Sequence, residues 1–546
     1  MTVNDELKKQ FYERLLTNLP YILMFTVLSV AFYVRIRLLS IPLERDEGEY
    51  AYIGQLLLKG IPPFTHAYTM KLPGTSVVYA FFMFLFGQTP TGIHAGLLIV
   101  NGTCIYLVYL LTKRLFDSSS AIYSCTSYAV LSLSWSVLGY FAHATQFVVL
   151  FALAGFELLL RPSKNPEYML FISGISFGLA VTMKQHAIIL LIYAALYLMR
   201  GAWKNHSSDK KSVLMGSFLF LLGTIIPYSL IVIWMIRSGS FTDFWLWTVQ
   251  YAREYTSLAS LTSGCTFFTD NFGKILKIQL FLWLFAGLGF VLFCLKKICC
   301  TDRFFVSGFL AFSFLSICPG LYFRPHYFIL LLPAVSLMTG VGINHGITFF
   351  SSAKMARFSN FMPPFLFIMA TSSCFFLERD NFFVSSPLDV SRDIYTECPF
   401  PEALQIANYI KNNSSPEDTI AVLGSEPEIY FYADRLSATG HIYMYGLTED
   451  QPYAERMQKQ MISEIEVAQP RYIVKVFESS SWMLGKSTKQ YIFDWEERYV
   501  KDFYDKIGAV DIIGARSTLY FWGEKARSYR PISRSFVTIY KKKDGM

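Results

Sequence analysis

Residues 212–236 read SVLMGSFLFLLGTIIPYSLIVIWMI and contain no charged side chain. A bilayer core of about 30 Å needs roughly 20 apolar residues, because a helix rises about 1.5 Å per residue. This stretch is therefore long enough to cross a membrane as one helix, and it predicts an integral membrane protein.

The composition of the whole chain supports the same class. Of its 546 residues, 53% are apolar and only 16% are charged, against roughly 25% charged residues in soluble domains. The 50 Phe and 34 Tyr residues exclude a disordered chain, which lacks such buriable surface. The net charge of +8 is spread between apolar runs, so a nucleic-acid partner is excluded. The nine cysteines show no disulfide framework.

Apolar runs of similar character recur along the first 377 residues, and we predict about eleven membrane spans there. The predicted spans are 20–39, 91–111, 120–138, 143–160, 168–183, 187–199, 212–236, 277–294, 304–319, 327–348 and 360–377.

The loops between these spans differ in charge. Lys and Arg are about threefold denser in the set that includes the N-terminus than in the opposite set, and positive loops stay in the cytoplasm. We therefore predict a multi-pass protein of the plasma membrane with a cytoplasmic N-terminus. An odd number of spans then places residues 378–546 outside the cytoplasm.

After residue 377 the sequence becomes mixed and charged, which predicts a separate soluble domain over 378–546. Alternating helix-like and strand-like runs indicate a small α/β domain with a partly parallel sheet. The expected elements are a helix at 401–412, a strand at 419–423, an amphipathic helix at 453–466 and a strand at 472–476. Residues 424–432 follow the first strand and fit either a ligand edge of the sheet or an acidic helix cap.

The longest outer loop of the membrane region, residues 40–90, is the candidate catalytic loop. Residues 44–49 hold four carboxylates directly after the first span. A carboxylate held where water is scarce can act as a general base, although acidic residues also favour a first helical turn. The apolar stretch 77–86 is too short to cross a bilayer and predicts a helix lying along the interface.

Other outer segments place polar and aromatic groups at the same membrane face. Cations at this depth could clamp a phosphate or simply snorkel to the lipid headgroups. The aromatic loop 237–276 fits an interfacial belt or a platform for a sugar or isoprenoid. The polar segments are Lys71 and the turns 142–146, 183–186 and 322–327.

Taken in order, these motifs resemble the GT-C membrane glycosyltransferases. The chain resembles especially the branch that contains the protein O-mannosyltransferases and the bacterial transferase that puts aminoarabinose on lipid A, glycosyltransferase families 39 and 83. The resemblance covers roughly residues 20–345. The segments that carry it are Arg45–Tyr52, Lys71–Pro73, Lys184–Gln185, Arg324–Tyr327 and Leu332–Pro333.

The resemblance implies an inverting transfer of a hexose or pentose from a polyprenyl phosphate to a hydroxyl outside the cytoplasm. The acceptor could be a lipid, a polysaccharide or a protein. Asp46 would be the catalytic base, and Glu47 would support it or help to hold a divalent metal. The implied donor-binding residues are Tyr50, Lys71, Lys184, Arg324 and His326.

The chain departs from the family pattern in two places. Met70 stands where the aminoarabinose branch has a glutamate, and the neutral stretch 143–146 replaces an expected carboxylate. Metal dependence therefore stays open. A polytopic transporter or lipid flippase is the alternative function, although the internal repeats typical of transporters are not visible. A scaffold or receptor would leave the acidic loop without a role.

Overall fold

The computed structural model of the chain describes residues 3–204, 210–350 and 356–544. Parts of two predicted cytoplasmic loops, 205–209 and 351–355, lie outside the described residues. The chain forms two compact units. Unit 1 comprises residues 1–38, 97–229 and 259–384, and unit 2 comprises residues 39–96, 230–258 and 385–546.

Every segment predicted to span the membrane contains a helix. Among the described residues, five helices are long and apolar enough to cross a membrane, namely α1, α4, α7, α9 and α12, whereas α6, α8, α13 and α15 are shorter apolar helices. The protein is thus a helical membrane protein, and the count of eleven crossings stays a prediction. The bounds are α1 (Val3–Arg37), α4 (Pro90–Leu115), α5 (Ser118–Leu131), α6 (Ala144–Leu160), α7 (Pro166–Met183), α8 (Ala187–Lys204), α9 (Lys210–Arg237), α12 (Leu261–Cys294), α13 (Arg303–Leu315), α14 (Leu332–Phe350) and α15 (Ala356–Leu377).

Helix α12 begins sixteen residues earlier than the predicted span at 277, and the limits of that membrane span stay a prediction. Ser260 caps the helix by accepting a hydrogen bond from the backbone N–H of Ser263. The first half of α12 is rich in Ser, Thr and charged residues, so a search for long apolar runs does not detect it. The backbone leaves helical geometry at Gln279, where the apolar half starts.

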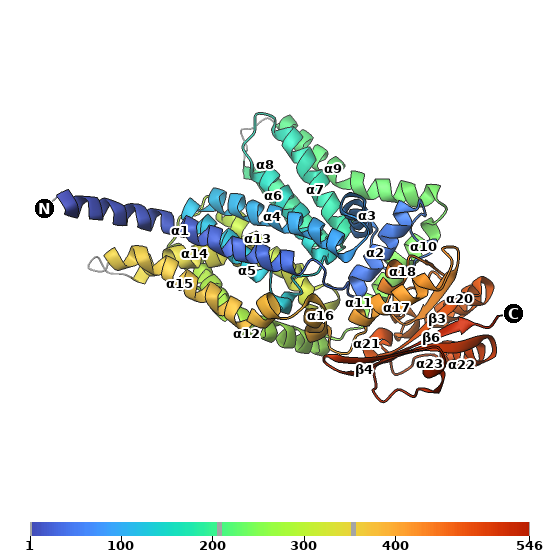
Figure 1. Cartoon of the computed structure of the whole chain (residues 1–546). Coiled ribbons are helices and arrows are strands. Elements are labelled where there is room, and N and C mark those ends of the chain that lie inside the picture. Colours follow the sequence, from blue (N-terminus) through green and yellow to red (C-terminus); the bar gives the residue numbers. More distant parts are fainter. Residues whose placement is uncertain (1–2, 205–209, 351–355, 545–546) are drawn as a thin grey trace. The chain divides into compact units, whose positions relative to one another are not determined.

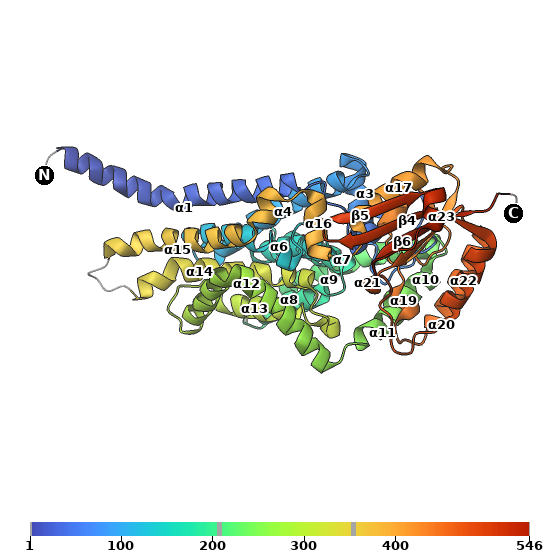
Figure 2. The same cartoon turned by 60° about the horizontal axis from the view of Figure 1, so that its bottom comes forward.

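In unit 1, helices α12, α14 and α15 run beside one another (Figure 2). Glycines let the first two approach closely. A Cβ atom at Gly289 would lie 2.0 Å from the carbonyl oxygen of Met338, and one at Gly342 would lie 2.0 Å from that of Phe285. Such backbone contact through small residues is typical of membrane helix pairs. A larger side chain at either glycine would push the two helices apart.

Unit 2 contains the helices of the predicted first outer loop. These are α2 (Arg45–Leu58) and α3 (Gly74–Phe86), so the predicted short apolar helix at 77–86 is present. Gly54 of α2 meets the backbone of α3, where a Cβ atom would lie 3.1 Å from the amide nitrogen of Ala80. On its other side α2 packs on α18 (Glu428–Ala433). The stretch predicted as an aromatic loop forms α10 (Phe241–Trp245), a π-helix (Leu246–Tyr251) and α11 (Ala252–Ser257).

The remaining part of unit 2 is an α/β domain with one six-stranded sheet (Figure 1). The order is β2-β1-β3-β6-β4-β5; β2, β1 and β3 are parallel, and the other pairs are antiparallel. The prediction of a partly parallel sheet is confirmed. The strands are β1 (Thr419–Leu423), β2 (Leu436–Ser437), β3 (Tyr472–Phe477), β4 (Tyr504–Gly514), β5 (Ser517–Trp522) and β6 (Phe536–Lys542). The helices are α16 (Pro387–Tyr395), α17 (Phe400–Asn412), α19 (Tyr445–Thr448), α20 (Ala454–Ala468), α21 (Ser479–Trp482), α22 (Tyr491–Phe503) and α23 (Glu524–Ser528), besides α18.

Candidate active site

The acidic segment of the first outer loop starts α2. Glu44 is the N-cap: its carboxylate accepts a hydrogen bond from the backbone N–H of Glu47 at 2.9 Å, and its own N–H donates to the carboxylate of Glu47 at 3.4 Å. This reciprocal capping box satisfies two amide groups that a helix start otherwise leaves unpaired. Burial, followed by the charges of Asp46 and Glu47, raises the pKa of Glu44 well above its ordinary value. Part of the acidic segment is thus a helix start, as one of the two interpretations predicts.

Asp46 and Glu49 are instead joined by one lysine. The ammonium of Lys71 donates to Asp46 Oδ1 at 2.7 Å and to Glu49 Oε2 at 2.5 Å. It also lies 4.6 Å from the ring centroid of Tyr50 and 5.4 Å from that of Tyr443. The structure therefore brings three predicted site residues, Asp46, Tyr50 and Lys71, into one cluster with Glu49 and Tyr443, which we call the acidic cluster.

The two carboxylates of the acidic cluster differ in their access to solvent. The side chain of Asp46 is 21% exposed and that of Glu49 only 3%. Burial raises the pKa of Glu49 despite the opposing charge of Lys71. Burial alone would lower the pKa of Lys71, but the carboxylates of Asp46 and Glu49 outweigh it and raise this pKa well above its ordinary value. Lys71 is thus a permanent cation, and Asp46 is the carboxylate that an outside molecule can reach.

Tyr443 is a member of the acidic cluster that the sequence did not indicate. Its hydroxyl donates to Asp46 Oδ1 at 3.4 Å, and it lies in the turn between β2 and α19. No periodicity or motif marks this turn. The α/β domain therefore contributes a side chain to the surroundings of Asp46.

Glu47 has different partners from those of Asp46. It is fully buried, and the ring of His94 lies 3.0 Å from its Oε1 and 2.9 Å from the carbonyl oxygen of Leu39. A carbonyl oxygen can only accept a hydrogen bond, so Nδ1 of His94 donates to Leu39. The hydroxyl of Tyr79 also reaches Glu47 at 3.5 Å. These contacts connect the start of α2 to α4.

The three predicted polar turns lie in unit 1, where the structure brings side chains from all three together. The ammonium of Lys184 lies 3.5 Å from Nε2 of His326 and 4.2 Å from the ring centroid of Tyr327. The rings of His326 and His143 stack with centroids 4.1 Å apart. Lys184 ends α7, His143 precedes α6, and His326 lies in a 3₁₀ helix (Pro325–Leu330). We call Lys184, His326, Tyr327 and His143 the basic cluster.

Two further side chains of these turns are His186 and Arg324. Nδ1 of His186 lies 3.0 Å from the carbonyl oxygen of Ser316, and burial, reinforced by Lys184, lowers the pKa of His186 to about 3. His186 is therefore neutral. Arg324, which precedes the 3₁₀ helix, stacks over the ring of Tyr322 at 5.4 Å.

The aromatic segment at 241–255 is largely part of the core of unit 2. Trp247 and Tyr251 are buried, and the ring of Trp247 stacks on Tyr68 at 5.7 Å and meets His441 edge-on at 5.6 Å. The side chain of Trp245 is 45% exposed. Most of these aromatic side chains thus stabilise the unit instead of forming an open platform.

The residues after β1 also differ from expectation. We predicted either a ligand edge or an acidic helix cap for 424–432. Pro427 precedes α18 and makes no side-chain cap, so the acidic cap was wrong. Glu426 instead accepts a hydrogen bond from Arg45 at 3.0 Å. This contact offsets the free-energy cost of burying the Glu426 carboxylate.

Comparisons with known proteins agree on the fold. Residues 70–231 match the family model for dolichyl-phosphate-mannose-protein mannosyltransferase. No curated protein sequence matches the chain. The fold is similar to that of ArnT from Cupriavidus metallidurans bound to undecaprenyl phosphate, with 13% identity, 95% of this chain and 97% of that chain covered, and a TM-score of 0.58.

A second similar structure is the archaeal oligosaccharyltransferase AglB from Archaeoglobus fulgidus, in complex with an inhibitory peptide and a dolichol-phosphate. The identity is 13%, the match covers 92% of this chain and 74% of that chain, and the TM-score is 0.51. At such low identity the likeness concerns the fold. Together with the mannosyltransferase family match, it identifies the chain as a membrane protein with the GT-C glycosyltransferase fold.

Proposed function

We propose that the protein transfers a sugar from a polyprenyl-phosphate donor to an acceptor hydroxyl outside the cytoplasm, with Asp46 as the general base. The observation that supports this proposal best is the acidic cluster, in which one cation is shared by two carboxylates and only Asp46 is accessible. The GT-C fold and the lipid phosphates bound in two similar structures support the class of donor.

The proposed reaction is a single displacement with inversion at the anomeric carbon. The acceptor hydroxyl loses its proton to a carboxylate oxygen of Asp46, and its oxygen forms a bond to the anomeric carbon. The bond from that carbon to the phosphate oxygen breaks, and the lipid phosphate leaves with the electron pair. Lys71 and Tyr443 hold the carboxylate of Asp46 by hydrogen bonds, which fixes the direction from which a proton can arrive.

The basic cluster is assigned to the donor phosphate. The donor phosphate is an anion both before and after transfer, so a cation such as Lys184 binds it in both states. His326 accepts from the ammonium of Lys184 within this cluster and so orients it. Arg324, from the same turn as His326, is assigned as a second phosphate contact.

The resemblance also raises the question of a divalent metal. In the acidic cluster the ammonium of Lys71 provides the positive charge beside Asp46 and Glu49, and Glu47 is bonded to His94. The proposed roles of Asp46 and Lys71 do not require a metal.

The decisive experiment is Asp46→Asn, which keeps the size of the side chain and removes the base. Purified protein is assayed with a radiolabelled pool of lipid-linked sugars and an acceptor extract of the cell envelope. General-base catalysis contributes about 10²- to 10⁴-fold, so transfer should fall by at least about a hundredfold. The matched control is Asp434→Asn, because Asp434 also pairs with a lysine, Lys59, but in an exposed position.

The control should transfer at the parental rate. Full transfer by Asp46→Asn would refute the role of this residue. If the parent chain transferred no sugar from any donor in the pool, a transporter or lipid flippase would become the better explanation.

A further inference from the structure

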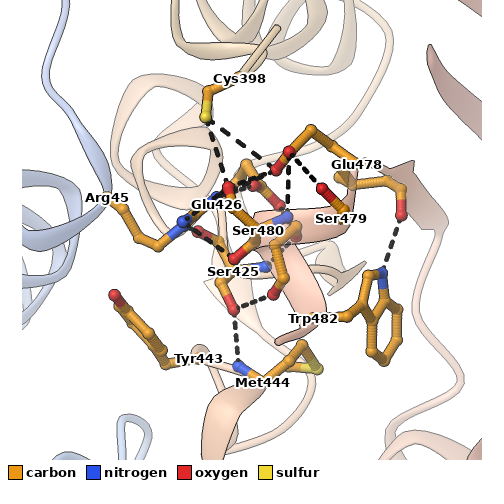
Figure 3. A network of polar contacts seen from close by, with 12 residues as sticks. Arg45, Cys398, Ser425, Glu426, Tyr443, Met444, Glu478, Ser479, Ser480 and Trp482 are labelled. Atoms are coloured by element: carbon orange, nitrogen blue, oxygen red, sulfur yellow. Dashed lines mark hydrogen bonds and ion pairs between the residues drawn. The ribbon is translucent and has the colours of Figure 1, made fainter. Parts of the chain in front are cut away.

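The residue directly before Asp46 is held by the α/β domain. Arg45 is buried, and its guanidinium donates from Nε to the carbonyl oxygen of Ser425 at 2.7 Å and from Nη2 to Glu426 Oε1 at 3.0 Å. Its Nη1 donates to the hydroxyl of Tyr445 at 2.9 Å and to the carbonyl oxygen of Ser480 at 3.1 Å. Figure 3 shows Arg45 reaching from its own ribbon into these segments.

The groups that receive Arg45 are fixed by hydrogen bonds of their own. The second carboxylate oxygen of Glu426 accepts from Ser481 Oγ at 2.7 Å, and Ser425 Oγ donates to the carbonyl oxygen of Ser481 at 2.5 Å. Ser480 Oγ donates to Glu478 Oε2 at 2.5 Å (Figure 3). These hydrogen bonds do not involve Arg45, so the acceptor groups are fixed independently of it. They accept a planar guanidinium in one orientation.

The same segment of the α/β domain contacts Asp46. Tyr445 accepts from Arg45, and two residues earlier Tyr443 donates to Asp46. Tyr445 in turn donates to the carbonyl oxygen of Ser480 at 2.8 Å. Two consecutive side chains of α2 are thus bonded to one short turn, so a shift of Arg45 moves Asp46 relative to its hydrogen-bond donor.

From this arrangement we infer that Arg45 is a positioning residue, through which the α/β domain sets the place of the Asp46 carboxylate. The inference rests on the proposed function, because it assigns to Asp46 the chemistry that needs to be positioned. Replacing a buried ion pair by apolar groups is often neutral for stability. The pair of Arg45 with Glu426 is therefore explained better by geometry than by fold stability alone.

The first test is Arg45→Lys, which keeps the charge but cannot make the same set of hydrogen bonds. A misplacement of about 1 Å at a catalytic group costs up to about a hundredfold in rate, so kcat should fall by about ten- to a hundredfold. KM for the lipid-linked donor should stay within about twofold, because Arg45 belongs to a different cluster from the proposed phosphate ligands.

The matched control is Arg392→Lys. Arg392 is also a buried arginine of the same unit, paired with the carboxylate of Glu402 and bonded to the carbonyl oxygen of Cys398. It should lower the thermal midpoint as much as Arg45→Lys does and leave kcat unchanged. Equal losses of kcat in both variants would make Arg45 a structural residue and overturn the inference.

A double-variant cycle separates this inference from the proposed function. If Arg45 acts through Asp46, Arg45→Lys should have no further effect on the residual transfer of Asp46→Asn, because coupled residues are not additive. Independent, multiplicative losses would overturn the positioning role while the base role of Asp46 stands. Full activity of Asp46→Asn would instead refute the proposed function, and the positioning role with it. If Arg45→Lys does not reach the membrane, Glu426→Gln replaces it in the cycle.

Discussion

Replacing Lys71 by methionine tests the electrostatics of the acidic cluster. The change keeps most of the length of the side chain and removes the ammonium from between Asp46 and Glu49. Glu49 is then a carboxylate with a 3% exposed side chain and no cation at its Oε2. Removing one partner of a buried ion pair costs about 3–5 kcal/mol, so Lys71→Met should lower the thermal midpoint of the purified protein by several degrees.

The fall in thermal midpoint caused by Lys71→Met should depend on pH, and the direction of this dependence follows from the pKa of Glu49. Burial already raises the pKa of Glu49 while Lys71 opposes this shift, so removal of Lys71 raises it further. A carboxyl group with a raised pKa in the folded state binds more protons there than in the unfolded chain, so it favours the folded state at acid pH and loses this contribution as pH rises. The difference in midpoint between parent and Lys71→Met should therefore grow from pH 5 to pH 8.

The double variant Lys71→Met with Glu49→Gln provides the internal control. It removes the unpaired charge, so most of the lost stability should return even though the cation is still missing. Transfer should stay low, because Asp46 still lacks the donor that holds it. A parental midpoint for Lys71→Met alone, or a double variant no more stable than the single one, would refute the account of the acidic cluster.

Two further predictions concern the rest of the molecule. Lys184→Ala should lower kcat/KM by about one to two powers of ten, because a charge-assisted contact contributes about 1.5–3 kcal/mol. Most of this change should appear in KM for the lipid-linked donor. Unchanged steady-state kinetics would exclude a phosphate contact. In a background without native cysteines, Glu417→Cys should react with a membrane-impermeant thiol reagent on intact cells and Ser163→Cys should not, because the loop charges predict that they lie on opposite sides of the membrane. Labelling of Ser163→Cys alone would invert the predicted topology.

The elements that the sequence predicts well are those with a clear local pattern. Strands β1 and β3 are short buried runs, and both occur within one residue of their predicted limits. The start of α2 follows from carboxylates in a first turn. By contrast, the polar half of α12 carries no apolar stripe long enough to detect, and β4 follows α22 without an intervening turn.

The residues of the candidate site also differ in how well the sequence predicts them. Asp46 and Lys71 stand in motifs with recognisable neighbours, and the structure brings them within hydrogen-bond distance. Tyr443 lies in a part of the chain with no such motif. Glu426 belongs to the segment 424–432 that the sequence singles out, but nothing in that segment predicts its pairing with Arg45 of α2. Pairings at that sequence separation leave no periodic trace, so the role of Arg45 could not be inferred from the sequence.

The pairing of Arg45 with Glu426 also constrains how the protein is made. The two residues are separated by 381 positions, and synthesis at about 5–20 residues per second takes roughly 20 to 75 s over that distance. During this interval the nascent first loop has none of the acceptors that bury its guanidinium in the finished protein. A chain that stopped before residue 385 would retain all the carboxylates of the loop. It would lack every acceptor that holds Arg45 beside them. Completion of the hydrogen bonds of Arg45 is thus one of the last events of biosynthesis, although residue 45 is among the first parts to be translated.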